Sequence, residues 1–347
     1  RNAPIAGGRS RWIVMCVIFS FCGSVVAQPP IVVDWMSELP NDPMILAAFI
    51  NPNNGRSEVI YDESSGTCDT DELWRGYDAN GHPGNYLDPW VGCLNAFASL
   101  DHYVAATSRT GSPRMDVLNV STLNNHFYIY CNGLIIEGLD IGPPGYGYAS
   151  ALCVLADGAG VYIGGGSTSC LPAYSTIFKL GSGAPWPACV PFSPYSLEAT
   201  PDSILSINFP SVHMVDKVAG TVGSTFDLFT GTVSNTGKTC MNGDTLYWAC
   251  KVDGSLHVGK YLLHQGSIWE QVLPFTDIPV ELVRDDHGRL WTAVGNNLVW
   301  LDSATGSYSS ETIGSAITGL DLQVGAIVLA GTMSTNVNFI MHGTPQP

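Results

Sequence analysis

Charged residues are scarce in this sequence, and basic residues are the scarcest. Only 13% of the 347 residues are charged, and Lys plus Arg number 14 against 30 Asp plus Glu, a formal net charge of −16 at pH 7. A surface so poor in basic side chains repels phosphate, which argues against a nucleic-acid partner. The low charged fraction also differs from that of a disordered acidic tail.

Local catalytic motifs are absent as well. The sequence contains no Gly-x-Ser-x-Gly, His-Glu-x-x-His or Cys-x-x-Cys pattern, and no Lys-Ser or Lys-Thr follows the glycines at 164–166. These absences argue against a serine-hydrolase elbow, a zinc protease helix and a phosphate loop. Paired carboxylates could still be assembled from distant loops, as glycosidases and lyases require, so an enzyme stays open.

Residues 1–27 have the parts of a secretory signal peptide. Three arginines lie at 1, 9 and 11, an apolar run follows at 12–21, and small residues end in Val25-Val26-Ala27. A run this short falls below the roughly 20 apolar residues that a membrane span needs. We expect cleavage, an exported product at the cell surface or outside the cell, and no span in the mature chain. The alternative is an uncleaved anchor.

Eight cysteines remain after the expected cleavage, and an even number in an exported chain favours disulfides over metal sites. The simplest pairing is sequential, since each bridge would then close a local loop, although sequence alone leaves other pairings open. Asn119-Val120-Ser121 is a glycosylation sequon, used only if the host glycosylates. The predicted disulfide cysteines are Cys68, Cys93, Cys131, Cys153, Cys170, Cys189, Cys240 and Cys250.

A short apolar pair followed by small residues recurs seven times at intervals of 37 to 58 residues, and helical periodicity is nearly missing. One four-stranded propeller blade takes roughly 40–50 residues. The chain is therefore predicted to be all-β: a seven-bladed β-propeller of four-stranded antiparallel blades, forming one domain over 28–347. We expect these motifs on the innermost strands, where small residues avoid crowding. The copies are at 45–48, 103–106, 161–164, 204–207, 246–249, 290–293 and 327–330.

One copy is specific enough to suggest a family. The segment 285–293 reads Asp-Asp-His-Gly-Arg-Leu-Trp-Thr-Ala, and a Gly-Asn turn, an apolar strand and Asp302 follow it. This resembles the repeat of two-component-regulator-type propellers, with weaker echoes at 157–164 and 242–248. The resemblance implies the propeller fold and, by analogy, extracellular sensing or binding. Asp285, Asp286 and His287 are predicted to form a tight turn in preference to an acid–base group.

The two chain ends are predicted to meet. The apolar segment 31–36 could add a strand to the sheet formed by 327–329 and 338–341, which would close the ring. If this strand were free, it could instead pair with an exposed sheet edge of a neighbouring molecule and build a fibre.

The densest polar segment is a predicted loop insertion at about 62–100. Its aromatic and polar side chains could contact a glycan, and its carboxylates are oxygen ligands of the kind calcium takes. The alternative is a solvated loop stapled by Cys68 and Cys93, since the EF-hand pattern is not met. The candidate ligand-binding residues are Trp74, Arg75, Tyr77, His82, Tyr86 and Trp90, and the candidate calcium ligands are Asp69, Asp71 and Glu72.

These observations rank three hypotheses for function. The first is a non-enzymatic extracellular binding or assembly module whose partner is a glycan, an extracellular protein or a copy of itself. The second is a secreted polysaccharide-active lyase or hydrolase that uses loop residues such as Arg75, Tyr77 and His82. The third is the subunit of a self-assembled extracellular fibre.

Overall fold

A computed structural model describes residues 31–39, 44–50, 55–62, 72–87, 94–100, 103–108, 114–119, 127–131, 134–135, 148–157, 160–167, 175–180, 186–192, 194–313, 315–323, 325–333, 335 and 337–346. The regular structure in these ranges is entirely β, which confirms the predicted class. Within the same ranges, no helix is long and apolar enough to cross a membrane.

The strands form antiparallel sheets that follow one another along the chain. The first sheet contains β2 (Met44–Ile50), β3 (Ser57–Asp62), β4 (Glu72–Tyr77) and β5 (Pro83–Leu87). The second contains β6 (Leu94–Leu100), β7 (Tyr103–Ser108), β8 (Arg114–Asn119), β9 (Phe127–Cys131) and β10 (Leu134–Ile135). The third contains β11 (Tyr148–Asp157), β12 (Gly160–Ser167), β13 (Ser175–Leu180) and β14 (Trp186–Val190).

The remaining sheets repeat the pattern. One contains β15 (Ser196–Ala199), β16 (Ser203–Asn208), β17 (Ser211–Asp216) and β18 (Val222–Asp227). The next contains β19 (Val233–Asn242), β20 (Thr245–Val252), β21 (Ser255–Leu262) and β22 (Gly266–Leu273). It is followed by β23 (Pro279–Arg284), β24 (Arg289–Val294), β25 (Asn297–Asp302) and β26 (Tyr308–Thr312). The last sheet combines β27 (Ser315–Gln323), β28 (Ala326–Met333) and β29 (Asn338–Pro345) with β1 (Ile31–Glu38).

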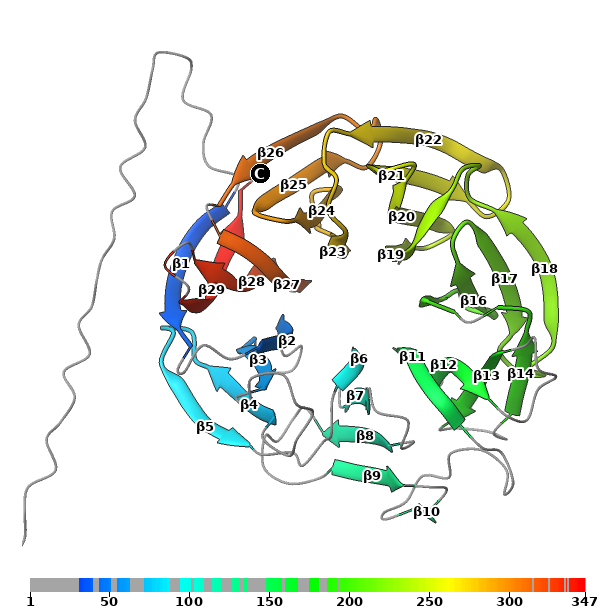
Figure 1. Ribbon diagram of the computed structural model, residues 1–347, viewed down its shortest axis with the longest axis horizontal. Helices are drawn as coiled ribbons and strands as arrows, with labels where there is room; N and C mark the ends of the chain where they lie inside the picture. The colour runs from blue at the N-terminus through cyan, green and yellow to red at the C-terminus, as the bar shows by residue number, and fades with distance from the viewer. Residues whose placement is uncertain are drawn as a thin grey trace, which may run out of the picture.

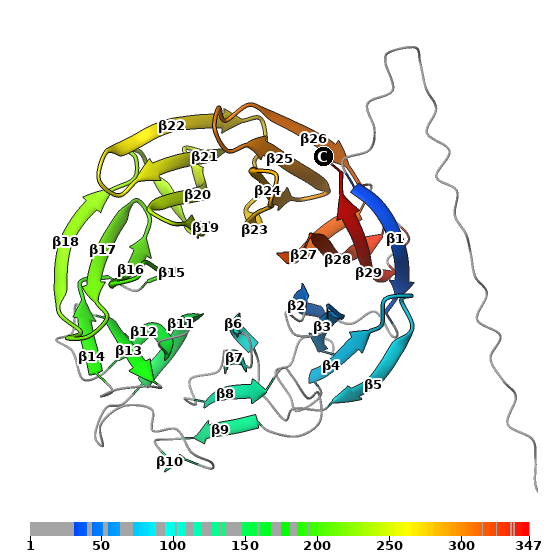
Figure 2. The same ribbon diagram turned by 180° about the vertical axis from the view of Figure 1, so that it is seen from behind.

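The sheets are arranged around a common axis in a propeller-like ring (Figure 1; Figure 2 from behind). The first strand of each sheet lies nearest the axis and contacts the first strand of the next, in the order β2, β6, β11, β15, β19, β23, β27 and back to β2. Each sheet therefore covers a face of both neighbours, which is how short sheets bury apolar area that none could bury alone.

The recurring apolar motif lies mostly on the second strand of each sheet, and the expectation of innermost strands was wrong for six of the seven copies. Only the copy at 45–48 lies on an innermost strand, β2. The second strands, such as β20 and β24, are buried along almost their whole length. A strand covered on both faces needs a continuous apolar run, so the motif marks the middle of each inter-sheet interface.

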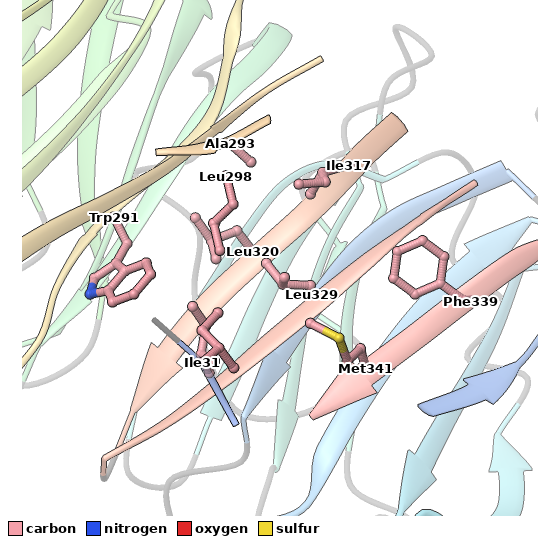
Figure 3. Close-up of a cluster of buried hydrophobic side chains, with 10 residues drawn as sticks. Ile31, Trp291, Ala293, Leu298, Ile317, Leu320, Leu329, Phe339 and Met341 are labelled. Carbon is pink, nitrogen blue, oxygen red and sulfur yellow. The ribbon is translucent and has the colours of Figure 1, made fainter. Parts of the chain in front are cut away.

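The ring closes as the sequence predicts. Strand β1 pairs antiparallel with β29, with Ile31 opposite Pro345 and Glu38 opposite Phe339. The core shared by this sheet and the β23–β26 sheet includes Ile31, Trp291, Leu298 and Phe339 (Figure 3). Because β1 is hydrogen-bonded within its own chain, it is not the free strand that the fibre hypothesis considered.

An Asp-Gly turn covered by a tryptophan recurs between sheets. In the β17–β18 turn, the Asp216 carboxylate accepts the backbone N–H groups of Val218 and Ala219 at 2.8 and 2.6 Å. Gly220 has φ +65°, and an added Cβ there would lie 2.6 Å from the Trp186 ring of the preceding sheet. The tryptophan thus packs on a glycine that the left-handed turn also requires.

The same arrangement occurs twice more. In the β25–β26 turn, the Asp302 carboxylate accepts backbone N–H groups and Gly306 lies against Trp269 of the preceding sheet. In the β4–β5 turn, Asp78 accepts a backbone N–H group in the same way and Gly81 lies against Trp35 of β1. In each case the tryptophan comes from the outermost strand of one sheet and covers the last turn of the next. This contact joins neighbouring sheets at the ring periphery, far from the axis.

Two of the predicted sequential disulfides, 131–153 and 240–250, are wrong, because the thiols of Cys153, Cys240 and Cys250 are free. Cys240 lies opposite Tyr247, whereas Cys250 lies opposite Gly237. This three-residue offset puts the two side chains on opposite faces of the sheet, so they cannot bond. Cys153 is buried with its sulfur 3.4 Å from the Pro194 carbonyl oxygen, so a 131–153 bridge is also wrong.

Cys189 is disulfide-bonded. Cys68, Cys93 and Cys170 lie outside the described residues, and Cys131 ends β9 with its side chain undescribed.

The tryptophan-covered turns predict different costs for similar glycine substitutions. Gly220→Ala should lose about 1–2 kcal/mol of unfolding free energy from left-handed backbone strain and about 1–3 kcal/mol more from the clash with Trp186. Gly243→Ala is the matched control, since Gly243 has φ +60° but nothing within 4 Å of an added Cβ. Urea denaturation measures both losses, and equal losses would contradict the proposed role of the tryptophan.

Candidate functional site

Part of the predicted insertion at 62–100 is regular sheet. It supplies β4, β5 and β6, and the Trp74 and Arg75 positions pair with Leu87 and Tyr86. The segment 72–77 reads Glu-Leu-Trp-Arg-Gly-Tyr and lacks the alternation of apolar and polar residues that marks a half-buried strand, so no local pattern indicated this strand. Asp69, Asp71 and Trp90 lie outside the described residues, as do the side chains of Glu72, Trp74 and Tyr86.

Tyr77 is part of the core, not of an exposed surface. It is fully buried and stacks on Trp35 with ring centroids 5.6 Å apart. Burial raises the pKa of Tyr77 to about 12, while the charge of neighbouring Arg75 opposes this rise. Arg75 therefore interacts inward with Tyr77, and these two residues do not present a joint binding surface.

His82 is exposed at the end of the β4–β5 turn. Its backbone N–H donates to the Asp78 carboxylate at 2.9 Å, and its ring nitrogen lies 3.2 Å from the same side chain. The hydrogen bond from the His82 backbone is the largest cause of a lowered Asp78 pKa. These contacts account for His82 as part of a turn.

Polar side chains that the sequence analysis did not single out come together around the axis. On β15, the Glu198 carboxylate accepts a hydrogen bond from the Thr239 hydroxyl of β19 at 2.7 Å. Thr239 also lies 2.7 Å from the Ser196 hydroxyl. Two innermost strands are thus joined by a network of one carboxyl group and two hydroxyl groups.

The next two innermost strands extend this polar group. Lys238 of β19 lies 3.3 Å from the Glu281 carboxylate of β23, and both side chains are more than a third exposed. On β27, the Asp321 carboxylate accepts the backbone N–H of Ile50 on β2 at 2.8 Å. We call Glu198, Lys238, Thr239, Glu281 and Asp321 the axial cluster.

Electrostatics link the three acids of the axial cluster. Burial raises the pKa of Glu198 from its ordinary 4.5 to about 7, and the charge of Glu281 adds to the rise. Burial likewise raises the pKa of Asp321 from 3.8 to about 6, again with a contribution from Glu281. Near neutral pH the buried carboxyl groups of Glu198 and Asp321 are therefore only partly ionised.

The axial cluster could not be found by local sequence patterns. Its members come from four strands whose cluster residues lie some 40 positions apart along the chain, and each acidic member has apolar neighbours on both sides in the sequence. These residues could have been found only from a correct assignment of the innermost strands. The apolar motifs were expected on those strands, but most of them mark the second strand of each sheet.

Asp285 confirms the predicted turn. Its carboxylate accepts the Arg289 backbone N–H at 2.7 Å, the Arg289 Nε–H at 2.7 Å and the Trp291 indole N–H at 2.9 Å. Although burial alone would raise the Asp285 pKa, the hydrogen bonds from Trp291 and Arg289 lower it below the ordinary value. The side chain fixes the β23–β24 turn.

Across the part of the chain that the structure describes, no group of three or more His, Cys, Asp or Glu side chains is placed to hold a metal ion. Asp69 and Asp71 lie outside that part, and the side chains of Glu72 and Asn119 are undescribed, so these predictions stay untested.

Comparison with known proteins supports the fold alone. No protein-family model matches this chain, and no curated protein does. Its fold is similar to that of the computationally designed Ika8 protein. The TM-score is 0.57 with 13% identity, over 88% of this chain and 98% of the designed one. At this level of identity the likeness carries the propeller-like architecture and no functional assignment.

The raised pKa of Glu198 predicts a pH dependence of stability. The folded protein keeps this proton to higher pH than the unfolded chain does. The stabilisation is therefore complete below about pH 4.5 and is lost as the pH rises toward 7. Glu198→Gln should flatten the fall of unfolding free energy over this window, measured by urea denaturation. Glu38→Gln on the exposed part of β1 is the control, and equal slopes in all three proteins would contradict this assignment.

Proposed function

We propose that this chain is a secreted, seven-bladed β-propeller that acts as a non-enzymatic extracellular binding module. The axial cluster would be its binding site, and the partner would be a basic segment of an extracellular protein. The resemblance of 285–302 to two-component-regulator-type repeats supports such a role by analogy. The signal-like residues 1–27 and the disulfide at Cys189 support export, since disulfides persist in oxidising compartments.

The observation that carries the proposal is the imbalance of charge at the axis. Glu198, Glu281 and Asp321 converge from three innermost strands, and Lys238 of the axial cluster is already paired with Glu281. A cationic group placed there would favour the ionised form of the raised carboxyl groups. The net charge of the chain would also steer a basic partner toward it.

The binding test uses a synthetic octalysine peptide and isothermal titration calorimetry. Binding should release protons near pH 6.5, seen as a heat that varies with the ionisation enthalpy of the buffer, because the peptide ionises Glu198 and Asp321. Glu281→Gln should weaken binding by roughly fivefold to tenfold, the effect of about 1 kcal/mol of attraction at a half-exposed site.

A matched pair of lysine variants locates the site. Lys238→Met should tighten octalysine binding, because it removes the competing cation from the axial cluster. Lys260→Met removes the same charge from β21, where Lys260 lies over the Tyr247 ring, and should not tighten it. Octalysine binding without proton release, or equal effects of the two lysine variants, would contradict a site at the axis.

A second candidate function is polysaccharide cleavage, favoured by one observation. Glu198 and Asp321 have pKa values of about 7 and 6, in the range where a carboxyl group can act as a general acid. Incubation with acidic and neutral polysaccharides, with and without added calcium, separates the functions. Release of shorter products that is lost in Glu198→Gln would establish the enzyme and displace the binding module.

A further inference from the structure

A second polar and aromatic cluster lies at the ring periphery, away from the axis. Strand β14 contacts the outermost strand β18 of the next sheet, and Phe192 lies two residues beyond the end of β14. The Phe192 side chain is 57% exposed, yet its ring lies 6.4 Å from the His213 ring at 39°. An exposed aromatic ring is thus held over a histidine of β17.

His213 has one satisfied and one unsatisfied ring nitrogen. The residue is only 6% exposed, and its Nδ1 lies 2.9 Å from the Thr225 hydroxyl. Its Nε2 is buried without a hydrogen-bond partner. A buried polar atom with no partner costs folding free energy, so a ligand atom that completes the hydrogen bond would gain it.

A carboxylate and a hydroxyl lie on the same face. Asp227 pairs with Ser211 and Thr225 pairs with His213, two residues apart along each strand, so all four side chains share one face of the sheet. The Ser211 hydroxyl donates to Asp227 at 2.7 Å, and Asp227 is exposed. The charge of Asp227 acts on His213 and favours a neutral ligand over an anionic one.

We propose that Phe192, His213 and Asp227 form a binding site for a single sugar ring. The apolar face of a pyranose would stack on Phe192, which turns about its χ1 angle to uncover His213. Ring hydroxyls would then bond to His213 Nε2 and to Asp227, which match a group that both donates and accepts. The site shares no residue with the axial cluster and does not depend on the function proposed there.

The test titrates the intact protein with methyl β-D-glucopyranoside, methyl β-D-galactopyranoside and methyl α-D-mannopyranoside, followed by saturation-transfer NMR and protein chemical shifts. At least one sugar should bind at millimolar concentration. Phe192→Ala should weaken that binding by roughly fivefold to tenfold, and Phe192→Trp should preserve or tighten it. Val218→Ala is the control, since Val218 is an exposed apolar side chain in the β17–β18 turn and contributes nothing to the site.

A histidine variant separates binding from structure. His213→Phe removes the unpartnered nitrogen, so sugar binding should be lost while the thermal midpoint is not lowered. No binding by any of the three sugars, or equal binding by the wild type and Phe192→Ala, would overturn the site. Octalysine binding should be unchanged in all these variants, so failure here is distinguishable from failure of the axial site.

Discussion

Pairing of β1 with β29 is the constraint on which the ring depends. Every sheet has two faces to cover, so the last sheet must meet the first, and the chain meets this need by bringing residues 31–38 to the edge of a strand some 300 positions later. The same strand carries Trp35, which stacks on both Tyr77 and His342, with centroids 5.6 Å apart in each pair. One segment therefore completes one sheet and covers the next (Figure 1).

The strands of each sheet differ in how much of their surface is buried. Second strands are buried on both faces and read as continuous apolar runs, and outermost strands supply the tryptophans that cover neighbouring turns. Innermost strands are less apolar where they face the axis. Glu198, Lys238 and Glu281 occupy such positions. The architecture thus leaves polar chemistry at the axis, and at peripheral edges such as β18.

Much of this architecture could be predicted from the sequence, because repeated patterns report burial. The apolar repeat, the closing strand at 31–36 and the Asp285 turn were all recovered, since each depends on neighbours within a few residues or on a simple periodicity. The strand of each sheet that carries the repeat was not predicted correctly, because small residues suit a strand at the crowded axis and a strand between two sheets equally well.

The site residues and the disulfide pairing could not be predicted without the strand register and the sheet topology. Cys240 and Cys250 seemed paired because they are close in sequence, and only the strand register shows that they face opposite sides. Tyr77 was predicted to be an exposed ligand-binding residue, but Trp35 of β1 stacks on it and it is buried. The axial cluster depends on contacts between sheets, such as Asp321 with Ile50 across 271 positions, which no local pattern encodes.

Hydrogen exchange in a variant that lacks residues 31–38 tests the closure of the ring most directly. The backbone amides of β29 should lose protection together with those of β27, β28 and β2, because the last sheet loses its edge strand and its contact with the first sheet loosens. Protection in these four strands equal to that of the intact chain would show that the ring is held together without β1, and would contradict the account.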